Sequence, residues 1–285
     1  HHSPLEKGDN PELDTSKFLG ERRKQMYISI IGSLQWEISI GTLDILVVVM
    51  TLSSFREFLC KGHMDRAKRV IGYLARFKDG CIRFRTEETD YSEPPKQDLD
   101  WATTVYGKGK DLIPKDAPVP LGRPVTMTHY YDANLYHDMI TGRSVSGVLH
   151  LINQTPIDWY AKKQATVESA VFGAKFVAMK HSVEALHGIC YKLRMMGVAV
   201  DGPTYIYGDN MSVINNTSKP ESVLRKKSNS ICYHFIREAV AMKECLTTHI
   251  PTLRNFSDLL TKCLSGKKRR DLVRGVLFDI YDYDA

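Results

Sequence analysis

Asp132, Asp209 and Asp258 are the residues of this chain whose type and placement best suit a chemical role. Each stands at or near the end of a short stretch typical of a strand or turn, where its carboxylate can point into a shared cleft. Hydrolysis of a phosphodiester by two metal ions needs carboxylates from different elements, which hold two divalent ions about 3.5–4 Å apart. Mg²⁺ prefers oxygen ligands, so such a site needs neither histidine nor cysteine. The three aspartates therefore predict most of the ligands of a two-metal nuclease.

The order of the elements around these aspartates supports that interpretation. Taken singly, Asp209 or Asp258 is better explained as the N-cap of a following helix. The apolar periodicity predicts strands at residues 128–132, 144–153, 156–161, 203–207 and 246–250, and helices at residues 171–192, 211–217, 223–242 and 255–264. The resulting order, β-β-β-α-β-α-α-β-α, indicates an α/β domain that opens on three strands able to pair antiparallel.

The region upstream of these strands has a different character. Residues 1–24 are polar and interrupted by Pro and Gly, residues 25–78 have helical periodicity, and residues 63–77 form an amphipathic helix with a basic face. Residues 86–124 are rich in Pro, Asp, Glu and Lys, which is typical of a linker. We therefore expect a helical unit at 1–85, a linker at 86–124 and an α/β domain at 125–285.

The composition is compatible with a nucleic-acid partner. The chain has 285 residues, 43% hydrophobic content and a net charge of +6, and its pI is about 8.9. The six cysteines have no zinc-ligand spacing and suggest reduced thiols, so we expect an intracellular location, in cytoplasm or nucleus. The apolar run at 43–52 is too short to span a bilayer, and no membrane insertion is expected.

Several stretches make this sequence resemble the RNase H domain of copia-type LTR retrotransposon Pol polyproteins. They are YDA at 131–133, TGRSVSG at 141–147, DWYAKKQATV at 158–167, YGDN at 207–210, YHFIRE at 233–238 and SDLLTK at 257–262. Upstream, YISIIGSL at 27–34 and KRVIGYL at 68–74 resemble the segment that connects the reverse transcriptase to RNase H in these elements. No Tyr-Val-Asp-Asp-type polymerase signature is present, so polymerase activity is not expected.

The resemblance implies an RNase H-like fold, a mixed five-stranded sheet with flanking helices, preceded by a thumb-like helical remnant of a reverse transcriptase. It also implies Mg²⁺- or Mn²⁺-dependent endonucleolytic cleavage of RNA in RNA–DNA hybrids. Asp132 would bridge two ions, Asp209 would help to hold one, and Asp258 the other. The expected partners are the hybrid and the missing reverse transcriptase domain or another protein assembly.

One position departs from this pattern. The family's metal-binding glutamate precedes an aromatic residue in the early turns of the long helix, and Lys175 occupies that place here. An ammonium group repels divalent cations, whereas it can pair with Asp132 and Asp209. Glu168 and Glu184 lie too far along the chain to replace the glutamate without rearrangement. Catalysis is therefore expected to be weak or absent.

Basic residues supply the expected contacts to nucleic acid, because RNase H proteins recognise the shape and backbone of a hybrid. These residues are Lys162, Lys163, Arg225, Lys226 and Lys227. The cluster at 267–270 is equally compatible with added affinity and with a solvated helix end. The sequence leaves open a ribonuclease, a non-catalytic nucleic-acid-binding or structural subunit (a pseudoenzyme), and a relic copy without selected function.

Overall fold

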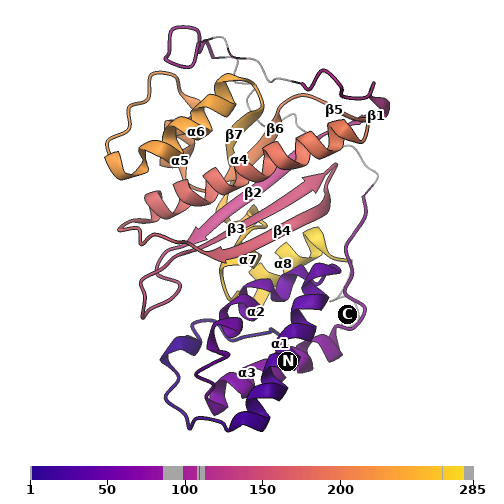
Figure 1. Cartoon of the computed structure of the whole chain (residues 1–285), viewed down its shortest axis with the longest axis vertical. Coiled ribbons are helices and arrows are strands. Elements are labelled where there is room, and N and C mark those ends of the chain that lie inside the picture. The colour runs from indigo at the N-terminus through magenta and orange to yellow at the C-terminus, as the bar shows by residue number, and fades with distance from the viewer. Residues whose placement is uncertain (1, 86–98, 108, 110–112, 265, 279–285) are drawn as a thin grey trace.

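The computed structural model describes residues 2–85, 99–107, 109, 113–264 and 266–278. Its centre is a five-stranded sheet with the order β4-β3-β2-β6-β7. The strands are β2 (Met127–Asn134), β3 (Val145–Ile152), β4 (Thr155–Lys163), β6 (Thr204–Gly208) and β7 (Cys245–His249). β2, β3 and β4 pair antiparallel, whereas β6 runs parallel to both β2 and β7. This is the mixed sheet expected for an RNase H-like fold, and the predicted fold class is confirmed (Figure 1).

The strand sequences explain their places in the sheet. β3 is buried along nearly its whole length, as expected for an apolar strand with both faces covered. β4 lies at the edge and contains Pro156, which has no N–H for a ladder and coincides with an irregularity in the register opposite Leu151. β2 alternates its side chains between the two faces, so Tyr131 and Asp132 point to opposite sides.

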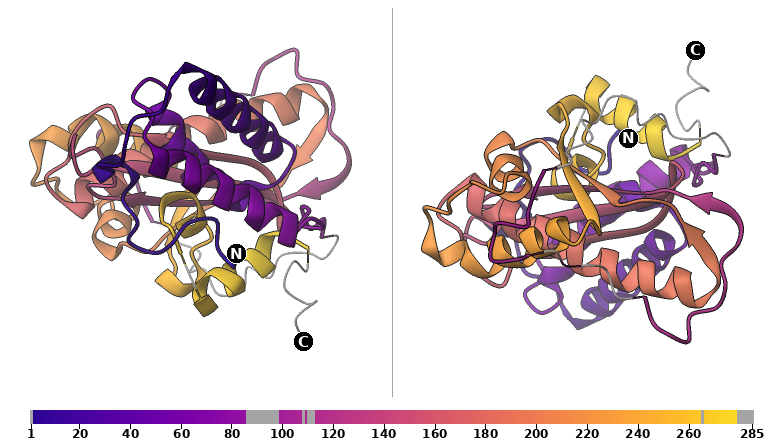
Figure 2. Two further views of the ribbon diagram at one scale, coloured as in Figure 1. Left: turned by 90° about the horizontal axis from the view of Figure 1, so that it is seen from below. Right: turned by 90° about the horizontal axis from the view of Figure 1, so that it is seen from above.

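The helices form a layer on each side of the sheet (Figures 1 and 2). One layer contains α4 (Val171–Met195), α5 (Met211–Ser218) and α6 (Ser230–Ala241), whose apolar residues share a core with Met127 and Tyr131. The other contains α7 (Asp258–Thr261) and α8 (Gly266–Val276), which pack on Leu149 and Leu151 of β3.

Several predicted boundaries were wrong. The helix expected at 223–242 begins only at Ser230, after a 3-10 turn. Contacts on both sides of residue 223 hold the chain in a non-helical path: Tyr233 donates to the carbonyl of Ser222, and Lys226 pairs with Glu168 at 2.8 Å. The helix expected at 255–264 is the single turn α7, and α8 follows it. A second, two-stranded parallel sheet of β1 (Leu121–Val125) and β5 (Val198–Val200) was not predicted.

The helical region expected upstream is present. It comprises α1 (Glu21–Ser39), α2 (Leu46–Leu52) and α3 (Lys61–Arg76). Val48, Val49 and Leu52 of α2 are buried, because α2 packs between the neighbouring helices and β4 and α7. No helix among the described residues is long and apolar enough to cross a membrane.

A buried polar contact joins the upstream helices to the C-terminal part of the chain. Asp44, which is 1% exposed, accepts from Arg269 of α8 at 2.6 Å and also from the hydroxyl of Tyr73 in α3. Trp159 of β4 donates its Nε1–H to the carbonyl of Ile38 at 3.0 Å. The region before residue 86 is therefore packed on the α/β domain.

The predicted linker falls partly outside the described residues, at 86–98, 108 and 110–112. Among its described residues, Trp101 is buried in the main core and contacts the guanidinium of Arg237, and Leu121 begins strand β1. The division into units at 1–85, 86–124 and 125–285 stays a prediction.

Candidate functional site

The three predicted aspartates meet at one end of the sheet. Asp132 lies in β2, Asp209 directly follows β6, and Asp258 is the first residue of α7. Because β2 and β6 are parallel, their carboxyl ends share one edge. One carboxylate oxygen from each aspartate lies within 4.8 Å of those from the other two. The fold thus brings together three carboxylates that lie far apart in the sequence, and their role as metal ligands stays a prediction.

A glycine lets α7 bring Asp258 to this edge. Gly147 of β3 pairs with Asp132 in the sheet register. A Cβ atom at Gly147 would lie 2.6 Å from a methyl carbon of Thr261 and 2.9 Å from the Cβ of Leu260. Real Cβ atoms do not approach so closely, so α7 can contact the sheet here only because position 147 has no side chain.

Asp209 and Asp258 are not the caps that the simplest interpretation suggested. The N-cap of α5 is Asn210, whose side-chain oxygen accepts from the N–H of Val213 at 3.1 Å. The residue before α7 is Ser257, and Asp258 is already helical. Both carboxylates are therefore directed toward the cluster.

Lys175 of α4 projects its ammonium group into the same cluster. Its Nζ lies 3.0 Å from Oδ1 of Asp132, which is the distance of an ion pair, although the two groups are not aligned for a hydrogen bond. The same Nζ donates a hydrogen bond to Oδ1 of Asp209. The Lys175 side chain is only 9% exposed, so it does not turn out to solvent. Lys175 holds two of the three predicted ligands.

Two further lysines complete the neutralisation of the aspartates. Lys262 lies 2.9 Å from Oδ2 of Asp132 and 2.6 Å from Oδ1 of Asp258. Lys268 of α8 forms an ion pair with the other oxygen of Asp258. Sequence reasoning missed both roles. The spacing of four residues between Asp258 and Lys262 was an available signal for their pairing on one helix, but nothing local points Lys268 to this site.

Charges control the protonation of the cluster. Burial alone would raise the pKa of Asp132, but the ammonium groups of Lys262 and Lys175 outweigh it and lower that pKa. Burial would lower the pKa of Lys175, and the carboxylates of Asp132 and Asp209 reverse the effect and raise it. The pKa of Asp258 is raised, mainly by burial and also by the neighbouring charge of Asp132. Lys175 therefore remains charged at neutral pH.

The carboxylate oxygens match the chemistry of Mg²⁺ or Mn²⁺, but the complete set of charges does not fit two such ions. Three ammonium groups already balance three carboxylates. A divalent ion about 4 Å from an ammonium group is repelled by about 8 kcal/mol at an effective dielectric constant near 20. Two ions would have to displace Lys175 from Asp132 and Asp209.

Neither of the two glutamates considered from the sequence, Glu168 and Glu184, lies among the three aspartates. Glu168 precedes the first turn of α4 and pairs with Lys226 at 2.8 Å. Glu184 lies further along α4 and contacts Lys180 and His181. Neither belongs to the carboxylate cluster found among the described residues.

The predicted nucleic-acid contacts are divided between the end of strand β4, which carries Lys162 and Lys163, and the segment before α6, which carries Arg225, Lys226 and Lys227. In the register of β3 and β4, Lys162 lies opposite Ser146, one residue from the partner of Asp132, and is exposed. Lys163 pairs with Asp138 at 2.7 Å. Arg225 and Lys227, on the loop before α6, are exposed. Lys162, Arg225 and Lys227 are thus the most available of the five, since acids partly neutralise Lys163 and Lys226.

The basic cluster at 267–270 matches neither expectation fully. Lys268 contacts Asp258, and Arg269, 3% exposed, is buried against Asp44. Lys267 and Arg270 remain exposed. Half of this apparently solvated cluster therefore holds the fold together.

Comparison with known proteins supports the resemblance drawn from the motifs. No family model matches the chain. It is 27% identical over 239 residues to the Retrovirus-related Pol polyprotein from transposon RE1 of Arabidopsis thaliana, covering 84% of this chain and 14% of that protein. It is 24% identical over 249 residues to the corresponding polyprotein from transposon TNT 1-94 of Nicotiana tabacum, covering 87% of this chain and 16% of that protein.

The chain therefore resembles transposon Pol polyproteins over most of its own length, and it spans about one seventh of the length of these relatives. Among solved structures, the N-terminal RNase H domain of Rv2228c from Mycobacterium tuberculosis is similar with a TM-score of 0.38 and 10% identity. That match covers 53% of this chain and 96% of that domain.

Proposed function

We propose that this chain is an RNase H-like module of a copia-type Pol polyprotein that binds RNA–DNA hybrids without hydrolysing them through two metal ions. The observation that carries the proposal is the position of Lys175, whose ammonium group contacts both Asp132 and Asp209. A cation that belongs to the protein thus occupies the place where the family's glutamate would help to hold a metal ion. The module is a pseudoenzyme in this respect.

The proposal follows from what Lys175 does to the ligand set. Two-metal cleavage needs carboxylates whose charge is available to the ions. Asp132 is fully buried and its two oxygens face Lys175 and Lys262 respectively. Displacing both lysines would leave their charges without partners in a confined site, which is costly. Aspartates that are held in this way stabilise the fold and do not recruit Mg²⁺ or Mn²⁺.

Hybrid binding is the part of the ancestral role that the surface supports. Lys162, Arg225 and Lys227 are exposed, and Lys162 lies near the end of β2 that carries Asp132. Contacts of this kind follow the backbone of a duplex rather than its sequence, and they weaken as salt rises. We expect binding to be salt-sensitive and independent of divalent ions.

The test is cleavage and binding of a labelled RNA–DNA hybrid with Mg²⁺ or Mn²⁺, comparing the wild type with Lys175→Glu. The matched control is Lys180→Glu, on the same helix but with an exposed partner in Glu184. We expect the wild type to bind but to cleave no faster than Asp132→Asn, and only Lys175→Glu to gain cleavage. Wild-type cleavage that Asp132→Asn abolishes would contradict the proposal, and so would a Lys175→Glu variant that folds and gains nothing.

A structural role is the second candidate, and exposed apolar side chains on α1 favour it. Met26 and Trp36 are 55% and 66% exposed, and Ile40, just past the helix end, is 59% exposed. Helical geometry places all three within one face. We propose that this face packs on the reverse transcriptase part of the same polyprotein. Loss of co-purification with that part in Trp36→Ser, with folding intact, would support this; unchanged co-purification would exclude this face.

A further inference from the structure

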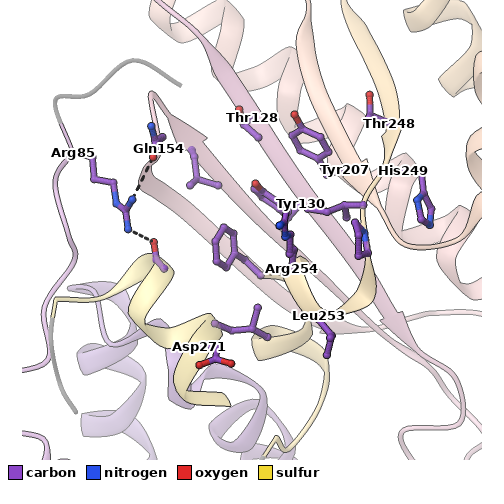
Figure 3. A pocket seen from close by; sticks show the side chains of 16 residues that line it. Arg85, Thr128, Tyr130, Gln154, Tyr207, Thr248, His249, Leu253, Arg254 and Asp271 are labelled. Atoms are coloured by element: carbon purple, nitrogen blue, oxygen red, sulfur yellow. Dashed lines mark hydrogen bonds between the residues drawn. The ribbon is translucent and has the colours of Figure 1, made fainter. Parts of the chain in front are cut away.

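A pocket of about 680 Å³ lies on the side of the sheet opposite α4 (Figure 3). Thr128 and Tyr130 of β2, Tyr207 of β6 and Thr248 of β7 line it from the sheet, and α8 supplies Asp271. Side chains along β2 alternate between the two faces of the sheet. Met127 and Tyr131 pack toward α4, so Thr128 and Tyr130 point to the opposite face. The volume is typical of a site for a small organic ligand.

Three tyrosines make this face of the sheet an aromatic platform. Tyr130 and Tyr207 are register partners on neighbouring strands, with ring centroids 5.2 Å apart and planes inclined by 26°. Tyr205, two residues before Tyr207, lies 6.4 Å from it with the planes inclined by 16°. The three rings are thus stacked in a row, and a nucleic-acid base can extend such a row by stacking on an aromatic ring.

Basic side chains surround the platform. Arg85 and His249 lie at opposite sides of the pocket in Figure 3, and Arg254 also lines it. Arg85 donates to Gln154 at 3.3 Å and to the carbonyl of Gly275 at 3.4 Å, while its Nε is buried without a hydrogen-bond partner among the described residues. Guanidinium groups bind phosphate oxygens with two N–H donors at once. The carboxylate of Asp271 repels a phosphate from the α8 wall and can accept from an N–H of a base.

From this combination we infer that the pocket binds one nucleotide of a single-stranded nucleic acid. The base stacks on Tyr207 and Tyr130, and the phosphate is bound by Arg254 and Arg85. A free nucleotide and a nucleotide within a strand offer the same two groups to the pocket, a base and a phosphate. The tyrosine platform extends beyond the pocket to Tyr205, which is not among the lining residues, and therefore favours a strand with more than one base.

This site is separate from the aspartate cluster, although β2 contributes to both. Asn255 and Ser257 are fully buried between them, and Asn255 donates its Nδ2–H to the carbonyl of Tyr131 at 3.1 Å. Phe256 packs edge-on against Tyr130 with ring centroids 4.9 Å apart. Asp132 itself is 0% exposed, so a nucleotide on the tyrosines does not contact it, and the inference does not depend on hybrid binding at the cluster.

The test is binding of a short fluorescent single-stranded RNA to the whole chain, measured by anisotropy, with AMP as a competitor. Tyr207→Leu removes the stacking ring and should weaken RNA binding by roughly 5- to 100-fold. Arg254 is exposed, and Arg254→Ala should weaken RNA binding. The slope of the logarithm of affinity against the logarithm of salt concentration should become shallower by the amount expected for about one phosphate contact. Tyr191→Leu is the matched control, because Tyr191 is 54% exposed on α4.

The outcomes separate this inference from the proposed function. We expect both pocket variants to lose single-strand affinity while binding to a blunt RNA–DNA hybrid changes by less than about twofold. Competition by AMP would identify a mononucleotide site, and its failure with strand binding intact would identify a site for a strand. Wild-type affinity in both pocket variants would overturn the inference, as would crosslinks from 4-thiouridine RNA that map only outside the pocket.

Discussion

Replacing Lys175 by methionine should destabilise the folded chain and at the same time create a place for a divalent ion. Methionine keeps much of the length of the lysine side chain and removes its charge. Asp132 and Asp209 would then face each other in a site where their side chains are 0% and 5% exposed. Removing one partner of a buried ion pair costs about 3–5 kcal/mol, because it leaves a buried charge unpaired.

The structure places the expected cost near the lower limit of that range. Lys262 still contacts Asp132 in the variant at 2.9 Å, so only part of the charge compensation is lost. We expect the free energy of unfolding in EDTA to fall by about 3 kcal/mol. Lys180→Met is the control on the same helix: its partner Glu184 is 43% exposed, and loss of such a surface pair should cost at most about 0.5 kcal/mol.

Urea unfolding with and without Mn²⁺ measures both effects. An ion that binds only the folded variant adds about 2.7 kcal/mol to its stability at a hundred times the dissociation constant. We expect Mn²⁺ to recover most of the loss in Lys175→Met and to leave the wild type unchanged. Two results would refute the reasoning: a Lys175→Met variant within about 1 kcal/mol of the wild type in EDTA, or equal stabilisation of both proteins by Mn²⁺.

Three further predictions concern the fold. Burial lowers the pKa of His150 from 6.5 to about 4, so its neutral form is stabilised by folding; stability should be full above pH 6.5 and fall by about 3 kcal/mol as the pH drops to 4. His150→Gln should flatten that fall in urea titrations at several pH values, and an unchanged profile would exclude His150 as its source. Arg269→Met should cost about 3–5 kcal/mol by leaving Asp44 unpaired, whereas the double variant with Asp44→Asn should recover part of the loss; no recovery would contradict the pairing. Gly147→Ala should lower the melting temperature by pushing α7 away at Thr261, at a cost of about 1–3 kcal/mol, and an unaltered melting temperature would mean that α7 does not contact β3 so closely.

The sequence predicted the parts of the site that depend on a local pattern, namely a strand next to an aspartate and a long periodic helix. The strand that contains Asp132 and the strand that precedes Asp209 could be found from their β-branched and aromatic residues, and parallel pairing of the two strands then brings the two carboxylates together. Lys175 could be identified as an anomaly because its position within a long helix is defined by periodicity. Its charge also indicated that it can pair with Asp132 and Asp209, and the structure has that arrangement.

What could not be predicted depends on packing between distant segments. Lys268 reaches Asp258 only because α8 folds back after α7, and neither of the two roles considered for the cluster at 267–270 includes this contact. α2 packs on α1 and α3 and also on β4 and α7, and the contacts with β4 and α7 join segments that lie far apart in the sequence. The three tyrosines of the platform are ordinary strand residues until the sheet register places them in a row.

The buried contact between Asp44 and Arg269 has a consequence for proteolytic processing. It joins α8 to the region before residue 86, and the bond between Trp159 and Ile38 adds a second tie. A protease that cuts between α3 and β1 would therefore leave two pieces that remain bound by their shared core. Maturation at such a cut would change the number of chains without changing the assembled body, and the two pieces, expressed separately, should complement each other.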